Sequence, residues 1–129
     1  MSKEKLYIFD TTLRDGAQTQ GVDFSIDDKV KISNSLDTLG VDYIEGGWPG
    51  ANPTDTEFFN KDHGFKNAKL TAFGMTKKSE HSAENDPMLA SLINSKSSSV
   101  CLFGKSWDFQ VDVALGITNE ENLENISES

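Results

Sequence analysis

The sequence predicts an α/β fold assembled from parallel βα units. Four short apolar runs are typical of strands: residues 6–9, 41–44, 70–74 and 99–103. Their first residues are 35, 29 and 29 positions apart, which is the repeat of a strand followed by a crossover helix. The runs are continuous rather than alternating, as in strands covered on both faces. Two architectures fit this order: a small open doubly wound sheet, or the first half (about four strands) of a (β/α)8 TIM barrel.

Helix-start signals separate the four runs. Ser25 and Asp28 form a capping-box pattern, and Gly40 stands where a helix C-terminus is expected. Between them, an apolar stripe is expected from Val30, Ile32, Leu36 and Leu39.

The later helices are predicted from the same kinds of signal. Asn52-Pro53 and Asp86-Pro87 each place a capping residue before a proline. In the second of these helices, one buried face is expected from Met88, Leu89, Leu92 and Ile93. After the fourth run, helical stretches are predicted over 108–115 and from Thr118, which opens another capping box.

Composition excludes several function classes. The formal net charge is −9, which argues against nucleic-acid binding and against a polybasic membrane surface. The single cysteine, Cys101, excludes an internal disulfide and fits a reducing cytoplasm. No secretory signal or apolar run of membrane-spanning length is present, so the sequence predicts a cytoplasmic chain of 129 residues forming one domain.

Candidate site residues follow the predicted strands, because parallel α/β folds place active sites at the carboxyl ends of their strands. They are Arg14, Asp15 and Gln18 after the first run, Glu45 and Trp48 after the second, Thr76 after the third and Lys105 after the fourth. Carboxylates suit a hard divalent cation, and a guanidinium suits an anionic, oxygen-rich ligand. Each residue also has a structural interpretation, such as a solvated loop pair for Arg14 and Asp15 or simple packing for Trp48.

Three segments carry a resemblance to a known family. Asp10-Thr-Thr-Leu-Arg-Asp-Gly-Ala-Gln18 resembles the first-strand signature of the isopropylmalate, homocitrate and citramalate synthases. Two further blocks, residues 40–53 and 102–108, are similar to the citramalate synthase branch. The resemblance extends over about residues 6–126.

The resemblance implies a metal-dependent (β/α)8 acyltransferase that condenses acetyl-CoA with pyruvate to citramalate, on a route to isoleucine. It implies Asp15 as ligand of a divalent metal (Mg2+, Mn2+ or Zn2+) and Arg14 as the group that stabilises the oxyanion of the 2-oxo acid. Gln18 would order the ligand, and Glu45 would line the pocket. Trp48, Thr76 and Lys105 are weaker pocket candidates, and the full-length enzyme is expected to be a homodimer.

The chain departs from that family in what it lacks. Family members take further metal ligands from a His-x-His pair on a later strand, whereas His63 and His81 are 18 residues apart. Residues 1–129 are therefore expected to be the N-terminal part of a pyruvate-carboxyltransferase-like catalytic barrel, inactive alone, without the second half or the C-terminal regulatory domain. Isopropylmalate or homocitrate synthase is the alternative within the family. A non-catalytic half-barrel that binds a metabolite or pairs with a partner is the alternative of another class.

Overall fold

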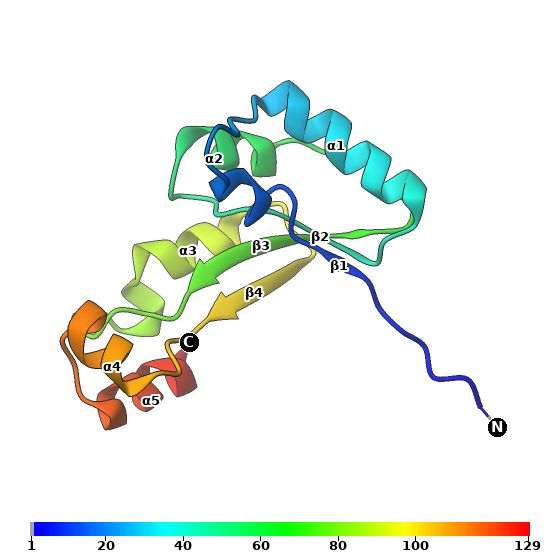
Figure 1. Ribbon diagram of the computed structural model, residues 1–129. Helices are drawn as coiled ribbons and strands as arrows, with labels where there is room; N and C mark the ends of the chain where they lie inside the picture. Colours follow the sequence, from blue (N-terminus) through cyan, green and yellow to red (C-terminus); the bar gives the residue numbers. More distant parts are fainter. Residues whose placement is uncertain (1) are drawn as a thin grey trace.

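The computed structural model describes residues 2–129 and contains one parallel sheet. Its strands are β1 (Phe9–Asp10), β2 (Tyr43–Gly47), β3 (Lys69–Met75) and β4 (Ser99–Phe103). They are hydrogen-bonded in the order β1-β2-β3-β4 (Figure 1), with Phe9 opposite Tyr43, Tyr43 opposite Lys69 and Thr71 opposite Ser99. An open doubly wound sheet reverses its strand order at a switch point, and this sheet does not. The sequential order is that of a (β/α)8 barrel, so the barrel prediction is confirmed.

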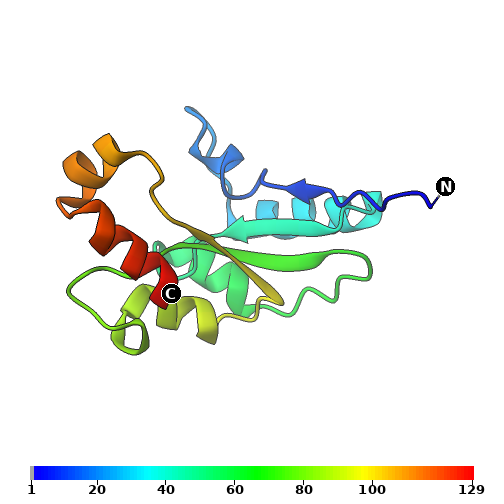
Figure 2. The same ribbon diagram turned by 90° about the horizontal axis from the view of Figure 1, so that it is seen from below.

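Helices connect the strands as the sequence predicts. The longer ones are α1 (Ile26–Leu39), α2 (Pro53–Asn60), α3 (Pro87–Asn94) and α5 (Asn119–Glu128), and short turns are η1 (Gly16–Gln18), η2 (Ala83–Asn85), α4 (Asp108–Gln110) and the π-helical η3 (Val111–Leu115). Helices α1, α2 and α3 lie on one side of the sheet, whereas α4 and α5 lie beyond the ends of β3 and β4 (Figures 1 and 2). Among the described residues, no helix has both the length and the apolar character that crossing a bilayer requires.

The predicted helix caps are present. The Ser25 side chain accepts the backbone N–H of Asp28, and the Asp28 carboxylate accepts from the Ser25 backbone, which completes the capping box of α1. Gly40 ends that helix with a φ of 90°, a left-handed conformation that favours glycine. Asp86 caps α3 by accepting from the backbone N–H groups of Met88 and Leu89.

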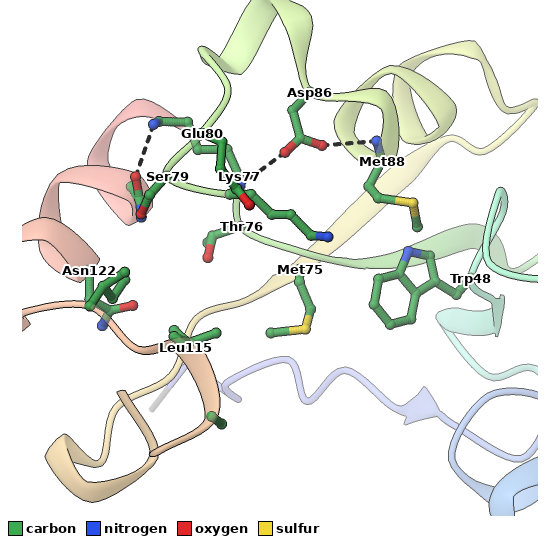
Figure 3. Close-up of a pocket in the computed structure, with 14 residues that line it drawn as sticks. Trp48, Met75, Thr76, Lys77, Ser79, Glu80, Asp86, Met88, Leu115 and Asn122 are labelled. Atoms are coloured by element: carbon green, nitrogen blue, oxygen red, sulfur yellow. Dashed lines mark hydrogen bonds between the residues drawn. The ribbon is translucent and has the colours of Figure 1, made fainter. Parts of the chain in front are cut away.

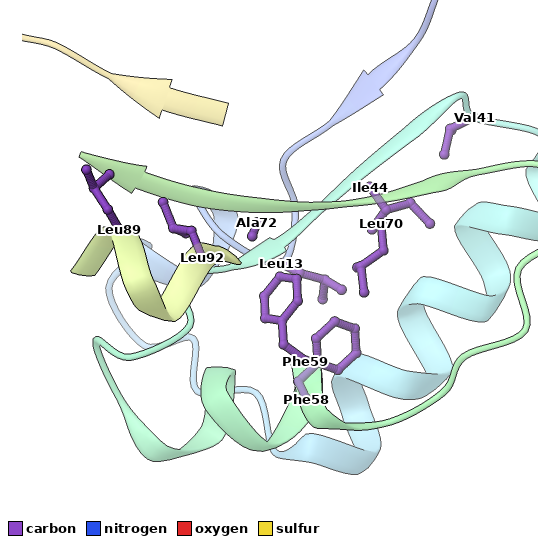
Figure 4. Close-up of a cluster of buried hydrophobic side chains, with 9 residues drawn as sticks. All are labelled: Leu13, Val41, Ile44, Phe58, Phe59, Leu70, Ala72, Leu89 and Leu92. Atoms are coloured by element: carbon purple, nitrogen blue, oxygen red, sulfur yellow. The ribbon is translucent and has the colours of Figure 1, made fainter. Parts of the chain in front are cut away.

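The hydrophobic core fills the space between the sheet and helices α1 to α3 (Figure 4). Phe58 and Phe59 of α2 are fully buried and pack edge to face, with ring centroids 5.6 Å apart. They reach up to Gly46 of β2, where an added Cβ would lie only 2.7 Å from the Phe58 ring. This close approach of helix and strand requires glycine, and it sets the distance between α2 and the part of β2 that follows Glu45.

Several boundaries and faces differ from the prediction. β1 begins at Phe9, and residues 6–8 are exposed, because only the end of this run reaches β2. β2 continues through Gly47, so Glu45 lies inside the strand rather than after it. Leu39 and Ile93 were expected in apolar faces but are exposed, since the sheet lies over other sides of α1 and α3.

Large apolar side chains remain exposed along the two edges of the sheet, at β1 and β4, and around α4 and α5. They include Leu6, Tyr7, Ile8, Phe9, Val100, Leu102, Phe103, Trp107, Phe109, Val113, Leu123 and Ile126. β1 and β4 are also the edge strands, with unpaired backbone groups on their outer sides. Both features leave apolar surface and backbone hydrogen-bonding groups uncovered at the edges of this sheet.

Buried Asp37 is a polar anchor that the apolar pattern of α1 does not reveal. Its carboxylate accepts the backbone N–H groups of Lys66, Asn67 and Ala68 at 2.7–3.0 Å, which fixes the segment entering β3. Burial opposes ionisation of this carboxyl, but the three donors outweigh it and lower the pKa of Asp37 below its usual value of 3.8.

Acid is therefore expected to weaken the fold through Asp37. The pKa of Asp37 is lower in the folded protein than in the unfolded chain. Its stabilising effect is therefore complete above the unfolded-state pKa and is lost as the pH falls through the folded-state pKa. Asp37→Asn should lower the free energy of unfolding by about 1–3 kcal/mol at pH 7, and the difference should shrink below pH 4. Urea unfolding at pH 7, 4 and 3 measures this; an Asp37→Asn deficit that stays constant across the three pH values would contradict it.

Candidate active site

A tight turn after β1 places Arg14 and Asp15 at the carboxyl end of the sheet. The carbonyl oxygen of Thr11 accepts from the backbone N–H groups of Arg14, Asp15 and Gly16 at 2.9–3.2 Å. The Asp10 carboxylate holds the start of this turn by accepting from the backbone N–H of Thr12 at 2.9 Å. The turn thus presents two oppositely charged side chains at the edge where parallel α/β folds hold their ligands.

Arg14 connects the exposed turn to a buried carboxylate. Its Nε donates to Glu45 Oε1 in a close ion pair, and its Nη1 lies 3.3 Å from Asp15 Oδ1. The Glu45 side chain is 1% exposed, whereas that of Asp15 is 64% exposed. A buried carboxylate requires a paired cation, so Glu45 both needs Arg14 and orients it. The structure thus brings these three predicted charged groups together at one place.

An irregularity in β2 accompanies Glu45. Glu45 pairs with Thr71 and Gly47 pairs with Ala72, so Gly46 is an extra residue in the ladder. Such bulges bend a strand and change the direction of neighbouring side chains, and they are common next to active sites.

Aromatic rings pack against the guanidinium of Arg14. The Cζ of Arg14 lies 4.2 Å from the centre of the Phe73 ring, a cation–π contact. Trp48 packs edge-on against the same ring, with centroids 5.4 Å apart at 84°. Sequence reasoning did not select Phe73, because inside the third apolar run it could not be distinguished from a core residue. Its position on the strand next to Glu45 was the one available signal.

Two hollows flank Trp48 at this end of the sheet. One, of about 490 Å³, is lined by Arg14, Gln18 and Trp48 together with residues of α1 and α2. The other, of about 440 Å³, is lined by Trp48, Thr76, Met75 and Met88, with Trp48 facing both methionines (Figure 3). Trp48 thus forms a wall common to the two spaces.

The structure brings some predicted pocket residues together and leaves one apart. Gln18 shares the first hollow with Arg14, and Thr76 shares the second with Trp48. Lys105 lines neither hollow: its Nζ lies 5.3 Å from the centre of the Phe103 ring, and its carbonyl oxygen accepts from Asn122.

Cys101 lies on β4, within the electrostatic reach of Glu45. Burial raises the pKa of its thiol, and the Glu45 carboxylate raises it further, against a smaller opposing effect of Arg14. A raised pKa disfavours the reactive thiolate, which suits a small, partly buried packing residue.

Asp15 is the one predicted metal ligand among the described residues. Within residues 2–129, no three His, Cys, Asp or Glu side chains cluster in a metal-binding arrangement. Asp15 nevertheless suits the role of one ligand, since its exposed carboxylate contacts only the Nη1 of Arg14, at 3.3 Å, among the described residues. Oxygen ligands of this kind are those that Mg2+ and Mn2+ prefer.

Comparison with known proteins gives a consistent result. The HMGL-like family model matches residues 5–129. The (R)-citramalate synthase of Aquifex aeolicus (strain VF5) is 54% identical over 128 residues, covering 98% of this chain and 24% of the relative. The (R)-citramalate synthase of Geobacter sulfurreducens is 47% identical, covering 100% of this chain and 24% of the relative. A 2-isopropylmalate synthase of Sulfolobus acidocaldarius is 31% identical, covering 100% of this chain and 32% of its own length.

A solved structure supports the fold. Hydroxymethylglutaryl-CoA lyase from Pseudomonas aeruginosa superimposes with a TM-score of 0.70 at 19% identity, covering 95% of this chain and 40% of the lyase. The likeness confirms the barrel-type arrangement of the strands. The chain spans about a quarter of the length of the citramalate synthases it matches.

Proposed function

Because this chain belongs to the HMGL-like family, we propose that the whole protein containing it is a citramalate synthase, which condenses acetyl-CoA with pyruvate. The observation that carries the proposal is the cluster of Arg14, Asp15 and Glu45 at the carboxyl end of the sheet, in a chain 43–54% identical to five (R)-citramalate synthases. In the reaction, the methyl carbon of acetyl-CoA attacks the keto carbon of pyruvate. Hydrolysis of the thioester then releases CoA and citramalate.

Each candidate side chain has its own role in the proposed reaction. Arg14, oriented by Glu45, directs its guanidinium at the oxygen that becomes an alkoxide, so positive charge is in place where negative charge develops. Asp15 would hold the divalent metal, which when bound polarises the keto group as a Lewis acid. Gln18 orders the oxo acid in the hollow that it shares with Arg14. Trp48 and Thr76 bound the neighbouring space for the second substrate.

We further propose that residues 1–129 form the N-terminal part of the catalytic barrel. The two edge strands and the exposed apolar side chains support this arrangement, since further βα units would cover both. The remaining metal ligands and the base that removes the methyl proton would then come from those units. The proposal includes a homodimeric full-length enzyme and a cytoplasmic, isoleucine-forming role, in keeping with small-molecule substrates and a single cysteine.

Release of CoA tests the function directly. The whole protein, given acetyl-CoA, pyruvate and Mg2+ or Mn2+, is expected to release CoA, and the 129-residue chain alone is expected to release none above background. Replacing pyruvate by 2-oxoisovalerate or 2-oxoglutarate should give much slower release. A preference for 2-oxoisovalerate would assign isopropylmalate synthase instead, a preference for 2-oxoglutarate would assign homocitrate synthase, and release by the short chain would contradict the division of the site.

A further inference from the structure

A buried ion pair joins α1 to α2 directly beneath the candidate site. Lys29 of α1 is 2% exposed, and its Nζ pairs with Asp55 Oδ1 of α2. The same Nζ donates to the carbonyl oxygen of Gly46 at 2.7 Å. One ammonium therefore connects two helices to the backbone that immediately follows Glu45.

The second oxygen of Asp55 holds the loop between β2 and α2. Asp55 Oδ2 accepts the backbone N–H of Trp48 at 2.9 Å and the side-chain amide of Asn52 at 3.0 Å. Trp48 is thus fixed through its backbone on the same carboxylate that Lys29 neutralises. Its indole Nε1 is buried and has no hydrogen-bond partner among the described residues, which is rare for a buried donor.

Glycine at position 47 makes this arrangement possible. Gly47 has a φ of 140°, and an added Cβ would lie 2.5–2.7 Å from the carboxyl atoms of Asp55. The backbone passes so close to Asp55 that only a residue without a side chain fits. The glycine and the carboxylate therefore form one unit that sets the path of the loop.

Stability alone does not account for this pair. Removing two charges from water is costly, and apolar residues of similar size are often as stable as a buried ion pair. Apolar residues, however, could neither accept the Trp48 N–H nor donate to the Gly46 carbonyl. What the charged pair supplies is the position of the Gly46–Trp48 segment, whose Trp48 lines the hollow containing Arg14.

We propose that Lys29 and Asp55 are positioning residues that fix the Gly46–Trp48 segment, and through it the indole of Trp48, for the substrates of the proposed condensation. This inference rests on the proposed function for its catalytic consequence. Its structural consequence, the fixing of the loop, is measurable without any activity.

The test uses the whole protein with Lys29→Met, which removes the cation and keeps the length of the side chain. Hydrogen exchange in the peptide covering residues 46–52 is expected to accelerate about tenfold or more. The ratio kcat/KM should fall about tenfold or more, because small displacements of positioned groups are costly to the reaction. The double variant Lys29→Met/Asp55→Asn restores neutrality and retains an acceptor for the Trp48 N–H. It should slow the hydrogen exchange and raise kcat/KM part of the way back to the wild-type values.

Lys96→Met is the matched control, since the Lys96–Asp62 pair is exposed and lies 3.2 Å apart. It should change neither quantity. The proposal is overturned when folded Lys29→Met exchanges residues 46–52 at the wild-type rate, or when both Lys29 variants lose activity only in proportion to their unfolded fraction. If the wild-type protein releases no CoA, the proposed function fails, and the exchange comparison still decides whether the pair fixes the loop.

Discussion

Replacing Arg14 by lysine is expected to lower the kcat of the whole protein about 100-fold or more, the loss typical of removing one preorganised donor from a developing oxyanion. Lysine keeps the positive charge beside Glu45, but it lacks the planar fork that reaches Glu45 and Asp15 at once. It also loses the stacked contact with Phe73. Steady-state release of CoA, measured at saturating pyruvate and acetyl-CoA, gives the value.

Two further variants separate catalysis from folding at this position. Arg14→Gln leaves the buried Glu45 carboxylate without a cation, so the free energy of unfolding should fall by about 3–5 kcal/mol. Arg14→Gln/Glu45→Gln removes both charges and should recover most of that stability without recovering activity. A kcat for Arg14→Lys within threefold of wild type would show that any cation suffices at this place.

Asp15→Asn is expected to lower kcat about 1000-fold or more, since a bound metal supplies several kcal/mol of charge stabilisation to such reactions. The carboxylate is 64% exposed and contacts only Arg14 in the described structure, so its loss should barely change stability. Mn2+ binding, followed by the electron paramagnetic resonance of the free ion, should weaken in parallel with activity.

The control for this variant is Asp62→Asn, which removes an equally negative and largely exposed carboxylate far along the chain. It should leave both kcat and Mn2+ binding unchanged. Wild-type Mn2+ affinity in Asp15→Asn would remove this residue from the metal shell, whatever the effect on rate.

Local signals predicted the elements of the fold well. The capping residues Ser25, Asn52, Asp86 and Thr118 each cap the helix they were expected to start. These signals act within a few residues, so they can be read without knowing the fold. The choice between a barrel and an open sheet was different, since periodicity is common to both. The family resemblance favoured the barrel, and the observed strand order, β1-β2-β3-β4, agrees with it.

Long-range packing explains what the sequence did not predict. Periodicity placed Leu39 and Ile93 in apolar faces, yet the sheet covers other sides of their helices. Lys29 and Asp37 are buried on α1 because groups from distant segments pair with them there. A carboxylate and a carbonyl oxygen accept from Lys29, and backbone N–H groups donate to Asp37. No local pattern marks a lysine whose partner is a carboxylate 26 residues away.

The candidate site shows the same division. The rule that ligands bind at the carboxyl ends of parallel strands selected Arg14, Asp15 and Glu45, which the structure brings together. The rule gives no information on which side chains support them. The contact of Phe73 with the Arg14 guanidinium depends on the register of β2 against β3. The contact of the Lys29–Asp55 pair with Trp48 depends on how closely α2 approaches the sheet.

A crystal structure of the whole protein with pyruvate and Mn2+ tests the assignment of this site most directly. The expected result has an Asp15 oxygen bound to Mn2+ and the Arg14 guanidinium within hydrogen-bond distance of the pyruvate keto oxygen, with Glu45 still paired to Arg14 Nε. Pyruvate and Mn2+ bound elsewhere, with Asp15 facing solvent, would contradict it.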